Sequence, residues 1–382
     1  PSGCRKLHNL AKSVLILDEV QALPVNYLRP IVDTLDTLKR LFGASILFTT
    51  ASQPVLSGEI LGSNPFLSFK GLPKIHEIIP KAAGLHDKLR RVDLEFLGDR
   101  MSYDEVAEQV AQYSRVLCIV NTRKDAQEIY SRLPKDGICL HLSRMMCPDH
   151  VQETINEVKE ALASNSGIIR IVSTQLIEAG VDIDFPVVFR QEAGLGSILQ
   201  AAGRCNREGR LNRGKTFVFG FNKPLPPGFI TQTNNARKGI GMEHDWFSPE
   251  TIESYFLQLY SRVDDFDKAK VSTLLYKGEM QFETASSEFH LIDDNTTSVI
   301  VNWKNSMEQV ERLKKEGASY PIMKSLSQYS VNVRNRDLKK LNEAGAIEEI
   351  EDGIFVISDP SFYCKDMGLV TDNHWLEESL IV

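Results

Sequence analysis

Short apolar runs alternate with helical patterns from the start of the chain. The first hundred residues hold two strand-like runs, VLILDE at 14–19 and SILFTTAS at 45–52. Between them, residues 27–43 place apolar side chains at helical spacing and end at Gly43. This pattern predicts a strand–helix–strand unit of a parallel sheet, with its first strand buried.

A longer alternation follows. The strand-like runs RVLCIVNT, GICLHLS, GIIRIVST, FPVVFRQ and TFVFGF are joined largely by helical segments, and the Pro-rich stretch NKPLPPG follows the last run. Strands that alternate with helices predict a doubly wound α/β domain. Beyond it, short strands and helices mix without a clear order. We therefore expect domains at 1–100, 101–225 and 226–382, the last an accessory α+β region.

Composition narrows the class of protein. A chain of 382 residues with 42% hydrophobic and 25% charged residues has the size of two or three globular domains. Its apolar runs fall short of the ~20 residues that span a bilayer, so no membrane partner is expected. The N-terminus lacks both a signal peptide and an initiator Met, so we expect a piece of a longer protein.

The six cysteines indicate a cytoplasmic protein rather than a disulfide scaffold, because they are scattered and form no CxxC pair. Cys139, His141, Cys147 and His150 offer ligand types that zinc accepts. Their spacing is irregular, however, and packed or solvated side chains are the favoured interpretation.

The net charge excludes a protein surface that is uniformly basic for nucleic-acid binding. The net charge is −7 and the isoelectric point is about 5.7. A local basic track remains, because the segment GRCNREGRLNRGK at 203–215 holds four arginines and a lysine against one glutamate.

Two acids end the first strand-like run. Asp18 and Glu19 would lie at the carboxyl edge of a sheet, where open α/β folds bind ligands. An aspartate there can hold magnesium, and an adjacent glutamate can orient an attacking water. The alternative is a strand end whose acids face solvent.

Two arginines provide opposite charge later in the chain. Arg204 and Arg207 are three residues apart, a spacing that places them on one face of a helix. Two guanidinium groups can stabilise charge on a departing phosphoryl group. A solvated basic helix is the alternative.

The ordered series of motifs favours a functional role for the acid pair and for the two arginines over simple exposure to solvent. DEVQ at 18–21, TTAS at 49–52, STQLIEAGVDID at 173–184 and QAAGRCNREGR at 200–210 resemble motifs II, III, V and VI of superfamily 2 helicases. With CIVNTRKDAQ at 118–127, they resemble the CRISPR-associated helicase–nuclease of type I systems. The resemblance covers about residues 1–222. It implies a partial first RecA-like lobe, a complete second RecA-like lobe and a C-terminal domain.

The resemblance also implies a role for each matching residue. Asp18 would coordinate magnesium, Glu19 would position the hydrolytic water, and Arg204 and Arg207 would sense the γ-phosphate of ATP. The remaining residues group by role: Gly180, Asp182 and Gln200 at the nucleotide; Thr50 and Ser52 in coupling it to DNA; Thr122, Ser173 and Thr174 at DNA phosphates. Gln21 stands where many relatives have His, and either side chain could form a hydrogen bond across the lobe interface.

A phosphate-binding loop is missing from its expected place. Only seventeen residues precede Asp18, too few for the loop, its helix and the next strand. The string GRLNRGKT at 209–216 matches the loop formally. It follows the basic segment and runs into a strand-like run, whereas a phosphate loop opens a helix, so we interpret it as a basic turn.

The resemblance implies ATP-dependent translocation on single-stranded DNA and DNA unwinding in antiviral defence. The implied partners are a Cascade-type surveillance complex and the missing N-terminal helicase and HD nuclease segments. We expect the isolated chain to be inactive. Two alternatives stay open: another superfamily 2 translocase in repair or restriction, and a non-enzymatic module that binds DNA or a complex.

Overall fold

The computed structural model describes residues 2–79, 84–164, 167–178, 180–276, 280–291, 295–351 and 353–371. The chain forms two compact units. The first comprises residues 1–90, 193–200 and 225–293, and the second comprises 91–192, 201–224 and 294–382. Among the described residues, every helix is too short or too polar to cross a bilayer.

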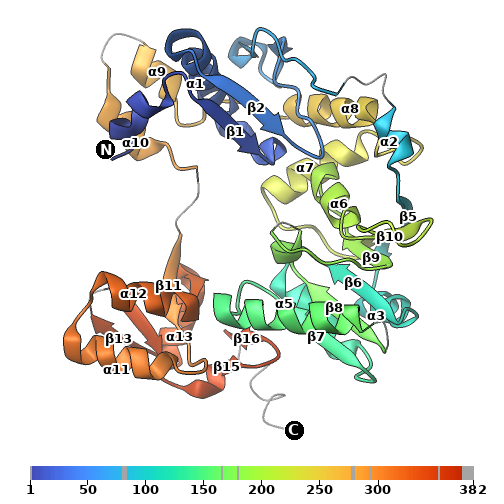
Figure 1. Ribbon diagram of the computed structural model, residues 1–382, viewed down its shortest axis with the longest axis vertical. Coiled ribbons are helices and arrows are strands. Elements are labelled where there is room, and N and C mark those ends of the chain that lie inside the picture. The colour runs from blue at the N-terminus through green and yellow to red at the C-terminus, as the bar shows by residue number, and fades with distance from the viewer. Residues whose placement is uncertain are drawn as a thin grey trace. The chain divides into compact units, whose positions relative to one another are not determined.

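The first unit begins with the predicted strand–helix–strand unit. Strands β1 (Val14–Asp18) and β2 (Ser45–Thr49) pair in parallel, and α1 (Leu28–Phe42) connects them (Figure 1). Gly43 ends α1 in the left-handed conformation, with φ of 64°.

The expectation that the first strand is buried is wrong. Val14 and Ile16 of β1 are 66% and 64% exposed. In the described part of the chain β1 has β2 as its single partner, and parallel strands become buried only when layers cover both faces of the sheet.

The rest of the first unit is mainly helical. Its elements are β3 (Glu59–Ile60), β4 (Phe69–Lys70), α2 (Leu85–Lys88), α7 (Phe229–Lys238), α8 (Pro249–Tyr260), α9 (Val271–Tyr276) and α10 (Phe282–Glu288). Helix α8 begins with Ser248 as a side-chain cap and Pro249 in its first turn. Residues 226–382 thus divide between the two units at 293/294, although the sequence suggested one accessory region.

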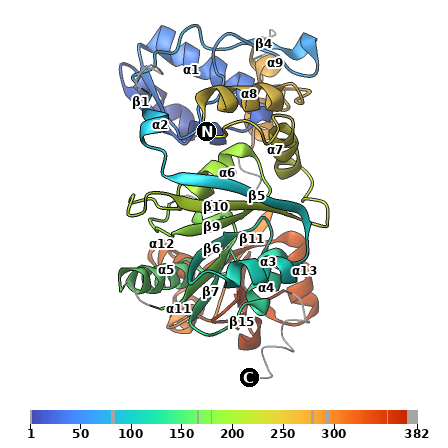
Figure 2. The same cartoon turned by 90° about the vertical axis from the view of Figure 1, so that its right-hand side faces the viewer.

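A six-stranded parallel sheet forms the centre of the second unit, in the order β5-β10-β9-β6-β8-β7 (Figure 2). The strands are β5 (Val92–Met101), β6 (Arg115–Ile119), β7 (Ile138–Leu142), β8 (Ile169–Ser173), β9 (Val187–Gln191) and β10 (Gly214–Phe221). The helices among them are α3 (Tyr103–Ala111), α4 (Arg123–Arg132) and α5 (Pro148–Ala163). Helix α6 (Leu195–Ala202) follows β9 in the sequence, and its residues 195–200 belong to the first unit. The predicted α/β class is confirmed, and β5 starts the sheet before residue 101.

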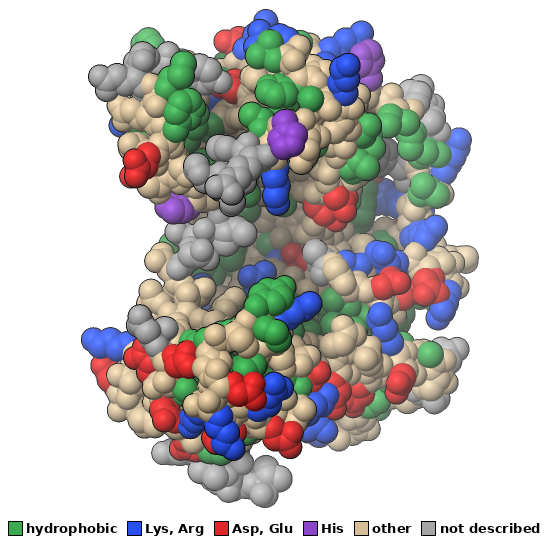
Figure 3. All heavy atoms as spheres, turned by 60° about the vertical axis from the view of Figure 1, so that its left-hand side comes forward, with side chains coloured by type: hydrophobic (Ala, Val, Ile, Leu, Met, Phe, Trp, Pro, Cys, Tyr) green, Lys and Arg blue, Asp and Glu red, His purple; other side chains and the backbone are tan. Residues whose placement is uncertain are grey.

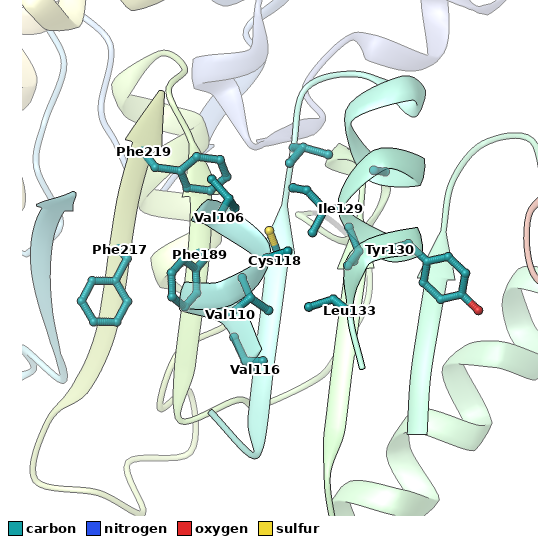
Figure 4. Packing of buried hydrophobic residues seen from close by; sticks show 14 of the residues in the cluster. Val106, Val110, Val116, Cys118, Ile129, Tyr130, Leu133, Phe189, Phe217 and Phe219 are labelled. Carbon is teal, nitrogen blue, oxygen red and sulfur yellow. The ribbon is translucent and has the colours of Figure 1, made fainter. Parts of the chain in front are cut away.

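Helices α3 and α4 form the core of this unit with the central strands. Val106 and Val110 of α3 and Ile129 of α4 pack in one buried cluster with Phe189 and Phe219 of the sheet (Figure 4). Such close packing fixes where each strand ends, and therefore where the predicted motif residues lie.

The C-terminal part of the second unit is α+β, as predicted. Strands β11 (Thr296–Ile300), β12 (Ser330–Arg334), β13 (Ile347–Glu351) and β14 (Ile354–Ile357) form a mixed sheet in the order β12-β11-β14-β13. Its remaining elements are α11 (Ser306–Glu316), α12 (Tyr320–Leu326), α13 (Asn335–Glu343), β15 (Tyr363–Cys364) and β16 (Gly368–Leu369).

This C-terminal sheet shares a core with the preceding part of the second unit. Met145 and Cys147, which precede α5, pack in one buried cluster with Val331 and Leu369. Leu369 N donates a hydrogen bond to Met145 O at 2.8 Å.

Candidate functional site

The acid pair of the first unit lies at the carboxyl end of β1. Asp18 is the last residue of the strand and is paired in register with Thr49, whose hydroxyl donates a hydrogen bond to the Asp18 carboxylate. Both acids are exposed. This is the position expected for carboxylates that hold a ligand at a sheet edge.

Glu19 is held in an unusual backbone conformation. Its φ and ψ of 53° and 45° are left-handed, which costs ~1–2 kcal/mol for a residue with a Cβ. Residue 19 immediately precedes the short helix Val20–Ala22, so this turn sets the direction in which the chain leaves the strand. A strained residue at a predicted catalytic position is consistent with function.

A network of neutral side chains connects Glu19 to the segment after β2. The Gln21 amide donates to the Glu19 carboxylate, and the Thr50 hydroxyl donates to the Gln21 carbonyl oxygen. Thr50 Oγ1 also accepts from Ser52 N at 3.1 Å, and Gln200 Nε2 lies 3.4 Å from Glu19 Oε2. The structure thus brings four of the predicted residues together around Gln21.

Gln21 and Thr49 also belong to this site, and Thr49 was not among the predicted residues. The hydrogen bonds of Gln21 to Glu19 and Thr50 lie within the first unit, and the expected bond across a lobe interface stays a prediction. A signal for Thr49 existed, because parallel pairing of the two apolar runs brings it opposite Asp18.

Arg204 and Arg207 belong to the second unit and lie in turns beyond α6, which ends at Ala202. The expectation that they share a helical face is therefore wrong. Asn206, between them, has φ of 47°, which a continuous helix does not allow.

The two arginines differ in exposure. Arg204 is 7% exposed and donates to the backbone oxygens of Ile177 and Glu178 at 3.1 Å and 2.6 Å. The Arg207 side chain is 45% exposed, and its Nε lies 2.8 Å from Asp182 Oδ1. Arg207 is thus the more accessible of the two to a ligand in this structure.

Gly180 and Asp182 lie on the exposed loop that follows β8. Gly180 has φ of 75°, which glycine adopts without strain, and Asp182 forms the ion pair with Arg207. The backbone N–H of Arg207 also donates to Asp184 Oδ1 at 2.7 Å. Carboxylates therefore hold the basic segment against this loop.

The three residues predicted at DNA phosphates follow neighbouring strands. Thr122 caps α4, with its hydroxyl accepting from Asp125 N at 3.1 Å. Ser173 and Thr174 are buried, and the Ser173 hydroxyl donates to Thr174 O at 2.9 Å. In this arrangement Thr122 is the most accessible of the three, and all three roles stay predictions.

A buried arginine that was not predicted connects these segments. Arg190 on β9 is fully buried, and it lies 2.8 Å from both Glu178 Oε1 and Asn121 Oδ1. Asn121 in turn donates to Glu192 O at 2.7 Å. An arginine inside the apolar run FPVVFRQ was the available signal, because such a residue is rarely buried unless it is paired.

The donor set of the first unit fits magnesium only in part. The exposed carboxylate oxygens of Asp18 and Glu19 are the ligand type that the ion prefers. In the described part of the same unit, no segment matches the glycine-rich phosphate loop. The formal loop match at 209–216 belongs to the second unit and enters β10 at Gly214, so its last residues are in a strand and open no helix.

Charges of both signs occur on the face drawn in Figure 3, where acidic and basic side chains are intermixed. The net charge of the chain is −7.

Parts of this chain are similar to known proteins. Residues 112–210 match the family model described as CRISPR-associated nuclease/helicase Cas3, C-terminal. The Methanothermobacter thermautotrophicus protein of that name is 28% identical over 205 residues, which cover 50% of this chain and 24% of the relative. The chain therefore spans about a quarter of this curated relative.

Solved structures show the same fold. The match to the T. fusca Cas3 structure with ATP covers 91% of this chain and 51% of the T. fusca chain, with a TM-score of 0.55 and 14% sequence identity. The T. fusca Cas3 structures with AMPPNP and with ADP are each 13% identical to this chain. A structure titled CRISPR RNA-guided surveillance complex, pre-nicking, matches 92% of this chain and 54% of its own, with a TM-score of 0.51 and 14% identity.

The fold defines a class: an α/β protein whose six-stranded parallel sheet, flanked by helices, matches a RecA-like lobe. Within that class, the family match and the relatives show a chain that is similar to the C-terminal helicase portion of Cas3. The match to the solved chains covers about nine tenths of this sequence.

Proposed function

We propose that this chain is the helicase portion of a type I CRISPR helicase–nuclease that hydrolyses ATP to translocate on and unwind DNA. The observation that carries the proposal is the network from Asp18 and Glu19 through Gln21 to Thr50, with Gln200 on the same carboxylate. These residues occupy motifs II, III and VI, and coupling of nucleotide chemistry to movement needs such a physical connection.

The residues divide the work by their chemistry. Asp18 would hold magnesium, which when bound offsets the charge of the phosphates. Glu19 orients the attacking water and accepts its proton, and the amides of Gln21 and Gln200 keep that carboxylate in place. Arg204 and Arg207 would meet the γ-phosphate, with Gly180, Asp182 and Gln200 at the nucleotide.

Movement on DNA follows from the same network. Thr50 and Ser52 lie directly after β2 and connect to Glu19 through Gln21, so they would respond when the partners of Glu19 change. Thr122, Ser173 and Thr174 would hold phosphates of single-stranded DNA without reading its sequence. The matching solved chain in a surveillance complex supports such a complex as partner, and reduced cysteines support the cytoplasm as location.

We propose that the first lobe needs a second polypeptide segment to work. Two paired strands with Val14 and Ile16 exposed are a marginal sheet, and further strands would cover them. The N-terminal helicase segment would add these strands and the phosphate loop, with the HD nuclease segment beyond it. The chain alone would then be inactive.

An ATPase assay with single-stranded DNA tests this proposal. The 382-residue chain is assayed alone and after mixing with a separately produced helicase segment that carries a phosphate loop and HD residues. We expect DNA-stimulated turnover only in the mixture. Glu19→Gln should lower it at least ~100-fold, whereas Glu59→Gln, an exposed acid of β3 in the same unit, should leave it unchanged.

Two results would contradict the proposal. Turnover by the chain alone would mean that it holds its own phosphate site, with 209–216 as the first candidate. DNA binding by the mixture without any turnover would favour the non-enzymatic module.

A further inference from the structure

The first unit contains a pocket next to the acid network. Its volume is about 190 Å³. Eighteen residues line it, from three parts of the chain: the segment after Glu19 and the start of α1, the loop after β2, and helices α6, α7 and α8. All of these lining residues belong to the first unit.

The lining of this pocket carries no charge. Leu28, Leu56, Phe256 and Leu259 are among its apolar residues, and Lys, Arg, Asp, Glu and His are all absent from the lining. Burial raises the pKa of the Tyr255 phenol, which forms a hydrogen bond with the backbone of Leu195. The pocket therefore presents neutral groups at any physiological pH.

Part of the polar lining is already satisfied within the unit. The Thr233 hydroxyl donates to Phe229 O at 2.8 Å, and the Tyr255 hydroxyl is held by Leu195. Gln21 and Gln200 supply the remaining amides, and both lie on the carboxylate of Glu19. A molecule in this pocket would touch the two side chains that hold the predicted catalytic glutamate.

The volume limits what can enter. Sites for drug-sized ligands measure ~300–1,000 Å³, whereas an apolar cavity of ~150 Å³ in another protein stays dry and binds benzene. A pocket of about 190 Å³ suits a molecule of one or two fused rings. A nucleotide is excluded on two grounds, because it is larger and because its phosphates would be buried without a cationic partner.

We propose that this pocket binds a neutral aromatic molecule of one or two rings, and that occupancy weakens the hold of Gln21 and Gln200 on Glu19. The binding part stands on the pocket alone. The coupling part rests on the proposed function. In that part, the pocket regulates ATP hydrolysis through the contacts of Gln21 and Gln200 with Glu19.

Binding is tested with indole as the probe, by methyl NMR of the 382-residue chain. We expect shifts at Val25, Leu28 and Leu56, which line the pocket, and none at Val188 or Val333 of the second unit. Indole-3-acetate, which has the same ring and a negative charge, should bind at least ~10-fold more weakly, because its carboxylate would lose water without gaining a cation. Absence of shifts at millimolar indole, or strongest shifts outside the lining, would overturn the proposal.

A pair of variants on α8 localises the effect. Leu259 is 3% exposed and lines the pocket, whereas Leu257 on the same helix is 50% exposed and does not. Leu259→Trp places an indole ring in the pocket itself and should abolish the shifts, and Leu257→Trp should preserve them. If Leu259→Trp does not fold, the wild-type shift map and the comparison with indole-3-acetate still decide the question.

Coupling is tested in the mixture that has ATPase activity. We expect indole to lower turnover at least ~2-fold there, and Leu259→Trp to be insensitive to it. Indole that binds without changing turnover refutes the coupling, and indole that no longer binds in the mixture shows that the added segment fills the pocket. Absence of ATPase in every mixture would instead count against the proposed function, with the binding result unaffected.

Discussion

Acid should weaken the second unit through one buried histidine. His141 on β7 is 2% exposed, and burial lowers its pKa from 6.5 to about 4. The backbone of Asp366 favours the charged ring, while Lys135 and His150 oppose it. Burial outweighs these contributions, so His141 is neutral at pH 7.

The magnitude follows from this shift. An unfolded chain binds a proton at His141 near pH 6.5, and the folded chain does so only near pH 4. Stability is therefore fully present above pH 6.5 and falls as the pH drops toward 4. At ~1.4 kcal/mol for each pH unit, the loss amounts to about 3 kcal/mol.

Other ionisable groups lie close to His141, so its contribution needs a control. Glu153 and Glu157 of α5, with Lys365 and Asp366 of the β15–β16 turn, line the same small pocket of about 30 Å³. His150, also on α5, has a pKa lowered by burial. The contribution of His141 is thus isolated only as a difference between the wild type and a variant.

His141→Gln provides this difference, because glutamine cannot titrate. The free energy of unfolding in urea is measured at pH 7 and at pH 4, with hydrogen exchange of the β7 amides as the readout. We expect the wild type to lose about 3 kcal/mol more than His141→Gln between these values. His290→Gln, an exposed histidine of the first unit, should behave like the wild type. Equal losses in the wild type and His141→Gln would refute the reasoning.

Two further predictions concern close packing. A Cβ at Gly194 would lie 2.6 Å from Thr233 Cβ, so Gly194→Ala should lower the free energy of unfolding by ~1–3 kcal/mol in thermal unfolding. Gly196→Ala is the control, because a Cβ there would lie 3.7 Å from its nearest neighbour, and it should be neutral or slightly stabilising. Tyr363→Phe removes the hydroxyl that accepts from Cys147 N at 3.0 Å, and should lower protection of β15 against hydrogen exchange by ~1–3 kcal/mol. Unchanged melting of Gly194→Ala, or unchanged exchange in Tyr363→Phe, would contradict these expectations.

The sequence predicted the elements of the sheet better than their arrangement. Runs such as RVLCIVNT and GIIRIVST are mostly apolar, as strands buried on both faces are. The spatial order β5-β10-β9-β6-β8-β7 could not be predicted from these runs alone, because one apolar strand resembles another and the order depends on packing between distant segments.

The roles of the site residues stay predictions, but their positions can be compared with the sequence. Asp18 ends its strand as expected, Glu19 follows it in a left-handed turn, and pairing with β2 brings Thr49 opposite Asp18. Arg204 is buried because the backbone oxygens of Ile177 and Glu178 accept its hydrogen bonds. A pattern of side chains in the sequence does not predict such bonds to backbone oxygens. Division of residues 226–382 between the units likewise depends on tertiary contacts, which local propensity does not encode.

The shared cluster around Met145 and Cys147 affects where this chain can be cut. A chain that ends at residue 225 would keep all six strands of the large sheet, but it would lose Val331 and Leu369 from that cluster. The truncated protein would then expose the apolar side chains of Met145 and Cys147 to water. This exposure would favour aggregation and the oxidation of Met145. Solubility of this lobe thus depends on residues that lie far beyond its last strand in the sequence.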